Sequence, residues 1–173
     1  EALVDVTAAL KLSRVTVVGH AMGGAIALSL VARHPSVLDR LVLVDPLVYS
    51  ASHGVLLEAS ALPVVGSLVF KQLYGRAAFR SFFAYYGEKF PVPWTRVDEF
   101  FGNFGTPAAR EGAHATLLSM LDTRSIVALL PRVTLPTLVV WGREDRRYPS
   151  SFARKLAREI ADSRLEILQT GHF

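Results

Sequence analysis

An uncharged run near the start of the chain, VTVVGHAMGGAIALSLVA (residues 15–32), restricts the fold more than any other segment. It opens with β-branched residues of the kind found in buried parallel strands. Glycines then interrupt it, and a helical pattern follows that Pro35 stops. A membrane-spanning helix does not suit such an interruption. The run therefore predicts a strand at 14–19, a sharp turn, and a helix at 22–34.

Three more apolar runs predict strands. They lie at residues 40–45, at 134–142 and in the first part of 164–173, and a helical pattern occupies 150–161 between the last two. Residues 1–11 have the pattern of an amphipathic helix end. Strands that alternate with helices indicate an α/β fold, in which a parallel central sheet is flanked by helices.

A long segment, residues 47–131, breaks this alternation. It is helix-prone and rich in Pro and Gly, and 12 of the 17 aromatic residues lie between Phe70 and Phe104. We predict a helical cap inserted into a core made of residues 1–46 and 132–173. The aromatic rings form the core of the cap, the roof of an apolar substrate pocket, or both.

Composition removes several classes of function. The chain has no cysteine, which excludes disulfides and thiolate metal sites. No HExxH motif or carboxylate cluster predicts a metal, and we expect none. The formal charge is +4, but the basic residues of 143–159 alternate with acids and have no aromatic stacking platform among them. We therefore expect a solvated helix face and no nucleic-acid partner.

The hydrophobic content and the start of the sequence lead to an expectation about cellular location. It is 51% hydrophobic with a mean hydropathy of +0.33, which is ample material for a buried core. No basic-then-apolar leader opens the sequence, so we see no signal peptide. We expect a cytoplasmic protein with no stable membrane insertion. The sequence is compatible with a homo-oligomer.

Residues suited to nucleophilic catalysis follow three of the predicted strands. His20, Ala21 and Met22 form the first turn, Asp145 follows the third strand, and His172 follows the fourth. The carboxyl ends of parallel strands meet at one edge of a sheet. A hydroxyl nucleophile needs a base, a group that orients the base, and donors for the oxyanion. The set contains each of these except the hydroxyl.

These motifs, in this order, resemble the α/β-hydrolase family, and specifically its lidded esterases and carbon–carbon bond hydrolases. The sequence GHAMGG (residues 19–24) matches the nucleophile elbow G-x-S-x-G except that Ala21 stands at the serine position. Trp-Gly-x-x-Asp (141–145) matches the acid turn of the family, and Gly-His (171–172) matches its histidine loop. Each motif alone is weak, but the ordered set is specific.

The resemblance implies a role for each candidate residue. It places Ala21 at the nucleophile position and makes Met22 N–H an oxyanion donor at a helix N-terminus. It implies no cofactor and a small, largely apolar substrate. It makes Asp145 the acid and His172 the base. It places His20 and Phe173 in the lining of the substrate pocket.

Two glycines of the elbow have a mechanical role in this interpretation. An elbow residue has a strained backbone, so its neighbours must be small. We expect Gly19 and Gly23 to relieve crowding between the strand and the helix.

Other residues compete for the acid and the base. Asp45 also follows a predicted strand, and some family members carry their acid there, but the Trp-Gly-x-x-Asp turn favours Asp145. His172 is the expected base. The other histidines beyond the elbow are predicted at a helix end or in the cap: His34, His53 and His114.

The chain departs from the family at both ends. It begins in the helix before the elbow strand, so the first strands and the loop that supplies a second oxyanion donor are outside it. It stops one residue after His172, before the final helix. We expect a partial chain of a larger protein, with sheet edges that promote aggregation when it is isolated.

Ala21 itself has three explanations. The serine was removed by an investigator, the protein is a natural non-catalytic ligand-binding member, or another mechanism operates, such as water activated by His172. At a positive φ, alanine costs about 1–2 kcal/mol that glycine avoids. Alanine is, however, the smallest change that deletes a hydroxyl and keeps the backbone. We favour an engineered replacement in a hydrolase of small esters, lactones or diketones cleaved at carbon–carbon.

Overall fold

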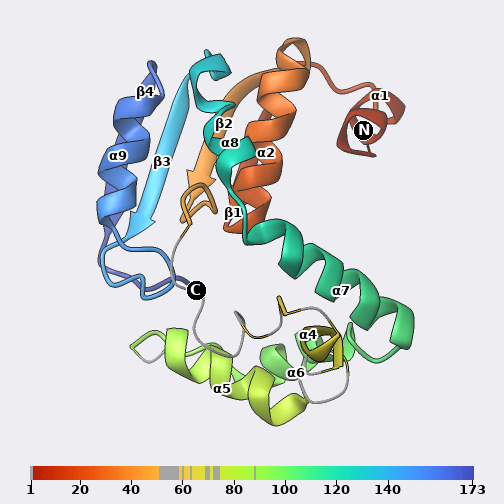
Figure 1. Cartoon of the computed structure of the whole chain (residues 1–173). Helices are drawn as coiled ribbons and strands as arrows, with labels where there is room; N and C mark the ends of the chain where they lie inside the picture. The colour runs from red at the N-terminus through yellow and green to blue at the C-terminus, as the bar shows by residue number, and fades with distance from the viewer. Residues whose placement is uncertain are drawn as a thin grey trace. The chain divides into compact units, whose positions relative to one another are not determined.

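The chain divides into two compact units, shown in Figure 1. The first contains Glu1–Ser50 and Thr123–Gln169, and the second contains Ala51–Asp122 and Thr170–Phe173. The computed structural model describes the following residues: 2–50, 59, 61–62, 64–68, 71, 75–87 and 89–173.

The first unit is built on a four-stranded parallel sheet with the order β1-β2-β3-β4. All four strands run in one direction, so their carboxyl ends lie at the same edge, as the arrowheads in Figure 1 show. That edge is where open α/β sheets bind ligands. The strands are β1 (Val15–His20), β2 (Leu38–Val44), β3 (Thr137–Gly142) and β4 (Ser163–Leu168).

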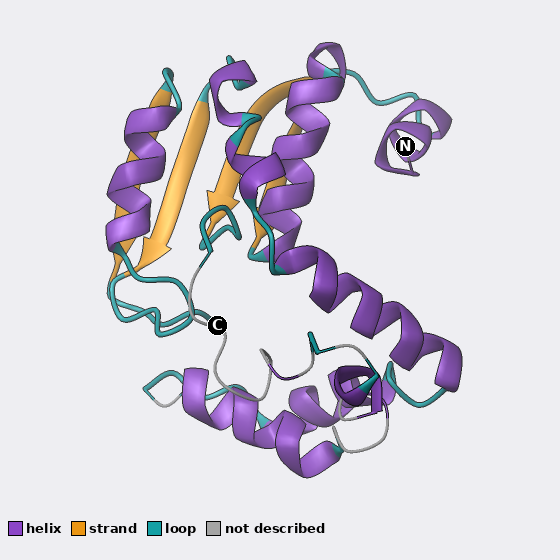
Figure 2. Ribbon diagram, viewed as in Figure 1, coloured by secondary structure: helices purple, strands orange, loops and turns teal. Residues whose placement is uncertain are grey.

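Two helices of the first unit cover the same face of the sheet (Figure 2). α2 (Met22–Arg33) packs on β1 and β2, and α9 (Ser151–Glu159) packs on β3 and β4. The strand residues that face these helices are buried, since Leu43 pairs with Val139 in register and both are fully inaccessible. The remaining helical elements of this unit are α1 (Ala2–Ala9), η1 (Pro35–Val37), α8 (Arg124–Val127) and η3 (Leu130–Arg132).

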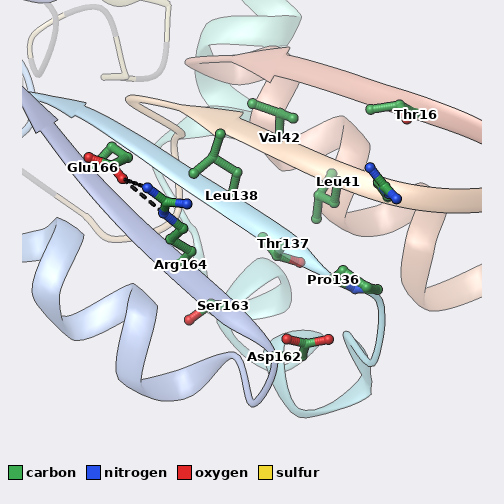
Figure 3. A pocket seen from close by; sticks show the side chains of 11 residues that line it. Thr16, Leu41, Val42, Pro136, Thr137, Leu138, Asp162, Ser163, Arg164 and Glu166 are labelled. Atoms are coloured by element: carbon green, nitrogen blue, oxygen red, sulfur yellow. Dashed lines mark hydrogen bonds and ion pairs between the residues drawn. The ribbon is translucent and has the colours of Figure 1, made fainter.

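The described residues leave the other face of the sheet open. Val18, Val42 and Leu138 lie on it in register, and Val18 is 65% exposed. A hollow of about 690 Å³ lies here, towards the amino ends of the strands (Figure 3). Parallel sheets are normally covered on both faces, and their ligand sites form at the carboxyl ends. We therefore interpret the hollow as part of a packing surface and not as the active site.

The fold predicted from the sequence is confirmed. The uncharged run is a strand, a turn and a helix, namely β1 and α2. α2 ends at Arg33 with His34 as its C-cap, one residue short of the predicted end and before Pro35. The other three predicted strands and the helix between the last two are β2, β3, β4 and α9. Within the described part of the chain, none of the helices combines the length and apolar character needed to cross a bilayer.

The described regular elements of the second unit are helices. α5 (Arg76–Tyr86) and α6 (Trp94–Gly102) pack against each other, and Arg80 donates from Nε to Oδ1 of Asp98 at 3.0 Å. This hydrogen bond lowers the pKa of the Asp98 carboxyl. The helices are α4 (Val65–Leu68), α5 (Arg76–Tyr86), α6 (Trp94–Gly102) and α7 (Pro107–Met120).

Aromatic rings form a core within this second unit. Phe79 is 9% exposed, and its ring centroid lies 5.2 Å from Phe83, 5.6 Å from Phe101 and 5.4 Å from Phe104. Such clusters bury much apolar area. Of the rings counted in the sequence, Phe70 and Tyr74 lie outside the described residues.

The action of the second unit as a cap over a pocket remains a prediction. The sequence predicted a cap at residues 47–131, whereas the compact unit contains residues 51–122 together with 170–173. Helix α8 belongs to the first unit, where it contacts α2.

Candidate active site

Ala21 occupies a strained turn between β1 and α2. Its backbone has φ 48° and ψ −116°, a combination that L-residues rarely adopt and that costs about 1–3 kcal/mol. Ala21 N donates to Val44 O at 3.0 Å, and Ala21 O accepts from Leu47 N at 2.8 Å and from Gly24 N at 3.0 Å. The last residue of β2 and the segment that follows it thus hold the turn on both sides. The strained backbone predicted for the elbow is confirmed, and its φ is positive.

Close approach of the strand and the helix explains two glycines beside this turn. A Cβ on Gly19 would lie 2.5 Å from Gly23 O, and a Cβ on Gly24 would lie 2.5 Å from the Cβ of Pro46. The prediction for Gly19 is therefore confirmed. The prediction for Gly23 is wrong, because a Cβ there would meet nothing within 4 Å. Gly24 is the second crowded position, since it faces the segment after β2.

We expect Gly19→Ala to lower the free energy of unfolding and Gly23→Ala to leave it unchanged or raise it. The first forces a methyl group into backbone atoms and should cost about 1–3 kcal/mol or more of unfolding free energy. The second, in the first turn of α2, should be neutral or should stabilise by up to about 1 kcal/mol. Urea unfolding of both variants of the full-length protein measures the difference. Equal losses in the two variants would contradict this account of the elbow.

Met22 is the first residue of α2 and directly follows the strained residue. The first N–H groups of a helix have no partner within the helix, and partial positive charge gathers there. This position suits a donor to a developing oxyanion. The role of the Met22 N–H as that donor remains a prediction.

Asp145 lies in a tight turn after β3, with its side chain fixed by backbone amides. Its Oδ1 accepts from Arg147 N at 2.6 Å and from Tyr148 N at 2.8 Å, and the residue is 7% exposed. Trp141 closes the same turn by donating from Nε1 to Tyr148 O at 3.0 Å. The Trp-Gly-x-x-Asp motif therefore holds the Asp145 carboxylate in a fixed position at the carboxyl edge of the sheet, where open α/β sheets bind ligands.

Asp45 takes part in this edge in a way that the sequence did not predict. It is 3% exposed, it has φ 41°, and its Oδ1 accepts from Gly142 N at 2.8 Å. A ring nitrogen of the exposed His20 lies within 4.8 Å of an Asp45 carboxylate oxygen. The signal in the sequence that could have indicated this role of Asp45 is the position of an acidic residue directly after a buried strand.

His172 and Phe173 belong to the second unit. His172 is 5% exposed, and its ring meets the ring of Phe173 edge-on with centroids 5.0 Å apart. Phe173 in turn packs on α5, 4.9 Å from Phe83 and 6.4 Å from Phe82. The histidine loop is thus attached to α5 by an aromatic contact. The pairing of His172 with position 21 or with Asp145 remains a prediction, as does pocket lining by Phe173.

The three other histidines differ in their placement. His34 is the C-cap of α2, which confirms its predicted position at a helix end. His114 is buried on α7 in the second unit. His53 lies outside the described residues.

The fold and this edge together define the class of the protein. A parallel sheet whose first strand runs through a strained turn into a helix, followed by a carboxylate turn after the third strand, is the framework of an α/β hydrolase. The model of the alpha/beta hydrolase family matches residues 1–173, and the chain belongs to that family.

Relatives of known name catalyse hydrolytic reactions. The chain is 28% identical over 180 residues to the 2-hydroxy-6-oxo-6-phenylhexa-2,4-dienoate hydrolase of Comamonas testosteroni, covering 95% of the chain and 58% of that enzyme. It is 28% identical over 176 residues to the pimeloyl-[acyl-carrier protein] methyl ester esterase of Neisseria meningitidis, covering 98% of the chain and 66% of the esterase. The chain thus spans little more than half the length of the first of these.

Solved structures share the fold. The enol-lactonase from Burkholderia xenovorans superposes with a TM-score of 0.76 at 23% identity, over 98% of this chain and 63% of the lactonase chain. An esterase from Exiguobacterium antarcticum superposes with a TM-score of 0.73 at 27% identity, over 98% of this chain and 64% of the esterase chain.

Proposed function

We propose that the chain carries the catalytic framework of a serine-dependent hydrolase and that Ala21 makes this form inactive. The observation that carries the proposal is the backbone of Ala21. An alanine gains nothing from φ 48° and ψ −116°, yet hydrogen bonds to Val44 at the end of β2 and to Leu47 after it hold Ala21 there. Strain that the surroundings enforce is typical of functional positions. Here it would present a nucleophile at the carboxyl edge of the sheet.

The mechanism needs a serine at position 21. Its Oγ would attack the substrate carbonyl while the imidazole of His172 takes the hydroxyl proton. Asp145 would hold the correct tautomer of that imidazole and stabilise its positive charge. The N–H of Met22 would bind the oxyanion.

Collapse of the tetrahedral intermediate would complete the first half of the reaction. The bond from the carbonyl carbon to the leaving group breaks, and His172 gives its proton to that group, which is an alkoxide or, for a diketone, a carbanion. Water would then attack the acyl-serine with His172 again as the base. The carboxylic acid leaves and the serine regains its proton.

The proposed substrate is small and largely apolar: an ester, a lactone, or a diketone cleaved at a carbon–carbon bond. The named relatives support these bond types, because they include an esterase and a dienoate hydrolase. The aromatic second unit supports an apolar substrate, since rings that form a lid core also suit the roof of a pocket. No cofactor takes part in the mechanism.

One observation favours a second function. Ala21 has no hydroxyl, so this chain fits a natural ligand-binding member of the family as well as an inactivated enzyme. The codon at position 21 in the native gene separates the two. A native serine codon would rule out the binding protein, and a native alanine codon would favour it.

Labelling by an alkyl fluorophosphonate tests the proposed nucleophile. We expect the Ala21→Ser form of the full-length protein to gain the mass of one phosphonyl group, because an activated serine displaces fluoride from phosphorus. The Ala21 form should remain unlabelled, and adding His172→Ala to the serine form should slow labelling strongly. Peptide mass spectrometry locates the label. Labelling elsewhere at the same rate in all three forms would reject position 21 as the nucleophile site.

A further inference from the structure

Asp45 lies between the turn that would carry the nucleophile and the turn that would carry the acid. Its own N–H donates to Val140 O at 3.1 Å, and its Oδ1 accepts from Gly142 N at 2.8 Å. Asp45 is therefore hydrogen-bonded to the last residues of β3 through both its backbone and its side chain.

Residues close to Asp45 in the sequence are hydrogen-bonded to Ala21 in the elbow. Val44 O accepts from Ala21 N at 3.0 Å, and Leu47 N donates to Ala21 O at 2.8 Å. On the other side, Gly142 O accepts from Asp145 N at 3.3 Å. A continuous series of hydrogen bonds thus runs from Ala21 through residues 44–47 and Gly142 to Asp145.

We propose that Asp45 is a positioning residue that fixes the acid turn relative to the elbow through the amide of Gly142, and that it is not the acid of the triad. This inference rests on the proposed hydrolase function. Catalytic groups must be held within a fraction of an ångström of the productive geometry. A hydrogen bond between the ends of β2 and β3 supplies that constraint between the two turns.

The residue type fits this role. Asp45 has φ 41°, and aspartate, asparagine and glycine tolerate positive φ better than other residues. The site is buried, so removal of the side-chain oxygen would leave the Gly142 N–H without its acceptor. The hydrogen bond between Asp45 Oδ1 and Gly142 N joins the end of β2 to the end of β3.

A pair of substitutions separates the side-chain oxygen from the charge. Asp45→Asn keeps an oxygen that can accept from Gly142 N and tolerates the backbone, but it has no charge. Asp45→Gly tolerates the backbone and removes the oxygen. If the glycine variant does not fold, Asp45→Ser replaces it, because its hydroxyl is one bond too short to reach the amide.

Amide exchange of Gly142 gives a measurement that needs no activity. In the full-length Ala21 protein, we expect Asp45→Gly to speed hydrogen–deuterium exchange at Gly142 about tenfold, the loss that one ordinary hydrogen bond contributes. Asp45→Asn should restore slow exchange. Unchanged exchange in the glycine variant would overturn the proposal.

Turnover tests the positioning itself. In the Ala21→Ser background, Asp45→Gly should lower kcat about 10- to 100-fold with little change in KM, as expected for a misplaced catalytic group. Asp45→Asn should recover most of that loss and leave the pH profile of kcat/KM in place. A loss of about 10⁴ in the asparagine variant would make Asp45 the triad acid and would overturn the proposal. If the serine parent shows no turnover at all, the hydrolase proposal fails, while the exchange result still decides the role of Asp45.

Discussion

Replacing Ala21 with serine in the full-length protein is expected to raise the turnover of short activated esters about 10⁶-fold over the alanine form. The proposed base, its proposed orienting acid and one proposed oxyanion donor are present at His172, Asp145 and Met22. In the proposed mechanism only the attacking oxygen is missing. The strained backbone at position 21 already exists, so the serine side chain needs no new turn to present it. Release of p-nitrophenol from acetate and butyrate esters measures the effect.

Two controls separate chemistry from stability in this experiment. Glycine adopts a positive φ without the Cβ penalty of alanine, so Ala21→Gly should stabilise the protein by about 1–2 kcal/mol. This variant should nevertheless remain inactive. His172→Ala in the serine form should return turnover close to that of the alanine form. The alanine form should still bind substrate, because the loss of one oxygen would leave the proposed apolar pocket intact. A serine form that folds and binds ligand but hydrolyses no ester, lactone or diketone would favour the binding protein.

Local patterns were sufficient to predict the sheet and the elbow. β-branched runs, a glycine turn and a proline after the helix identified β1 and α2 without any long-range information. The strain at Ala21 was predicted because a strand must turn directly into a helix there, which few backbone angles permit. The turn that carries Asp145 was also predicted from local sequence, since Arg147 N and Tyr148 N, which donate to its Oδ1, lie two and three residues further along the chain.

Contacts between distant segments were beyond such reasoning. Gly24 is crowded by Pro46, and Asp45 accepts a hydrogen bond from Gly142 across a strand pair. The position of Asp45 after a strand marked it as a candidate, but no local pattern names the distant partner of either residue. The same limit explains the wrong prediction for Gly23. The glycine repeat marked a tight approach, but only the packing of α2 on the segment after β2 decides which glycine is crowded.

The histidine loop shows a related limit. The Gly-His pair was found by its motif, but the contact of Phe173 with α5 was not, because the ring partners lie some ninety residues earlier in the chain. This contact places the loop in the same compact unit as the aromatic helices. If His172 is the base, as proposed, its position depends on this aromatic cluster.

Replacing Asp145 with asparagine in the serine-restored, full-length protein is expected to lower kcat about 10⁴-fold while the protein remains folded. The amide oxygen of asparagine can still accept from Arg147 N and Tyr148 N, so the turn should keep its shape. What changes is the group offered to the imidazole, which would favour the wrong tautomer and lose charge stabilisation.

The matched control is Asp45→Asn, which removes a buried carboxylate from the end of the neighbouring strand. Its kcat should stay well above that of Asp145→Asn, because the Gly142 amide still finds an acceptor. Steady-state kinetics of the two variants, with circular dichroism to verify folding, make the comparison. The reverse order, with Asp145→Asn nearly as active as the serine parent and Asp45→Asn crippled, would move the acid of the triad from the end of β3 to the end of β2.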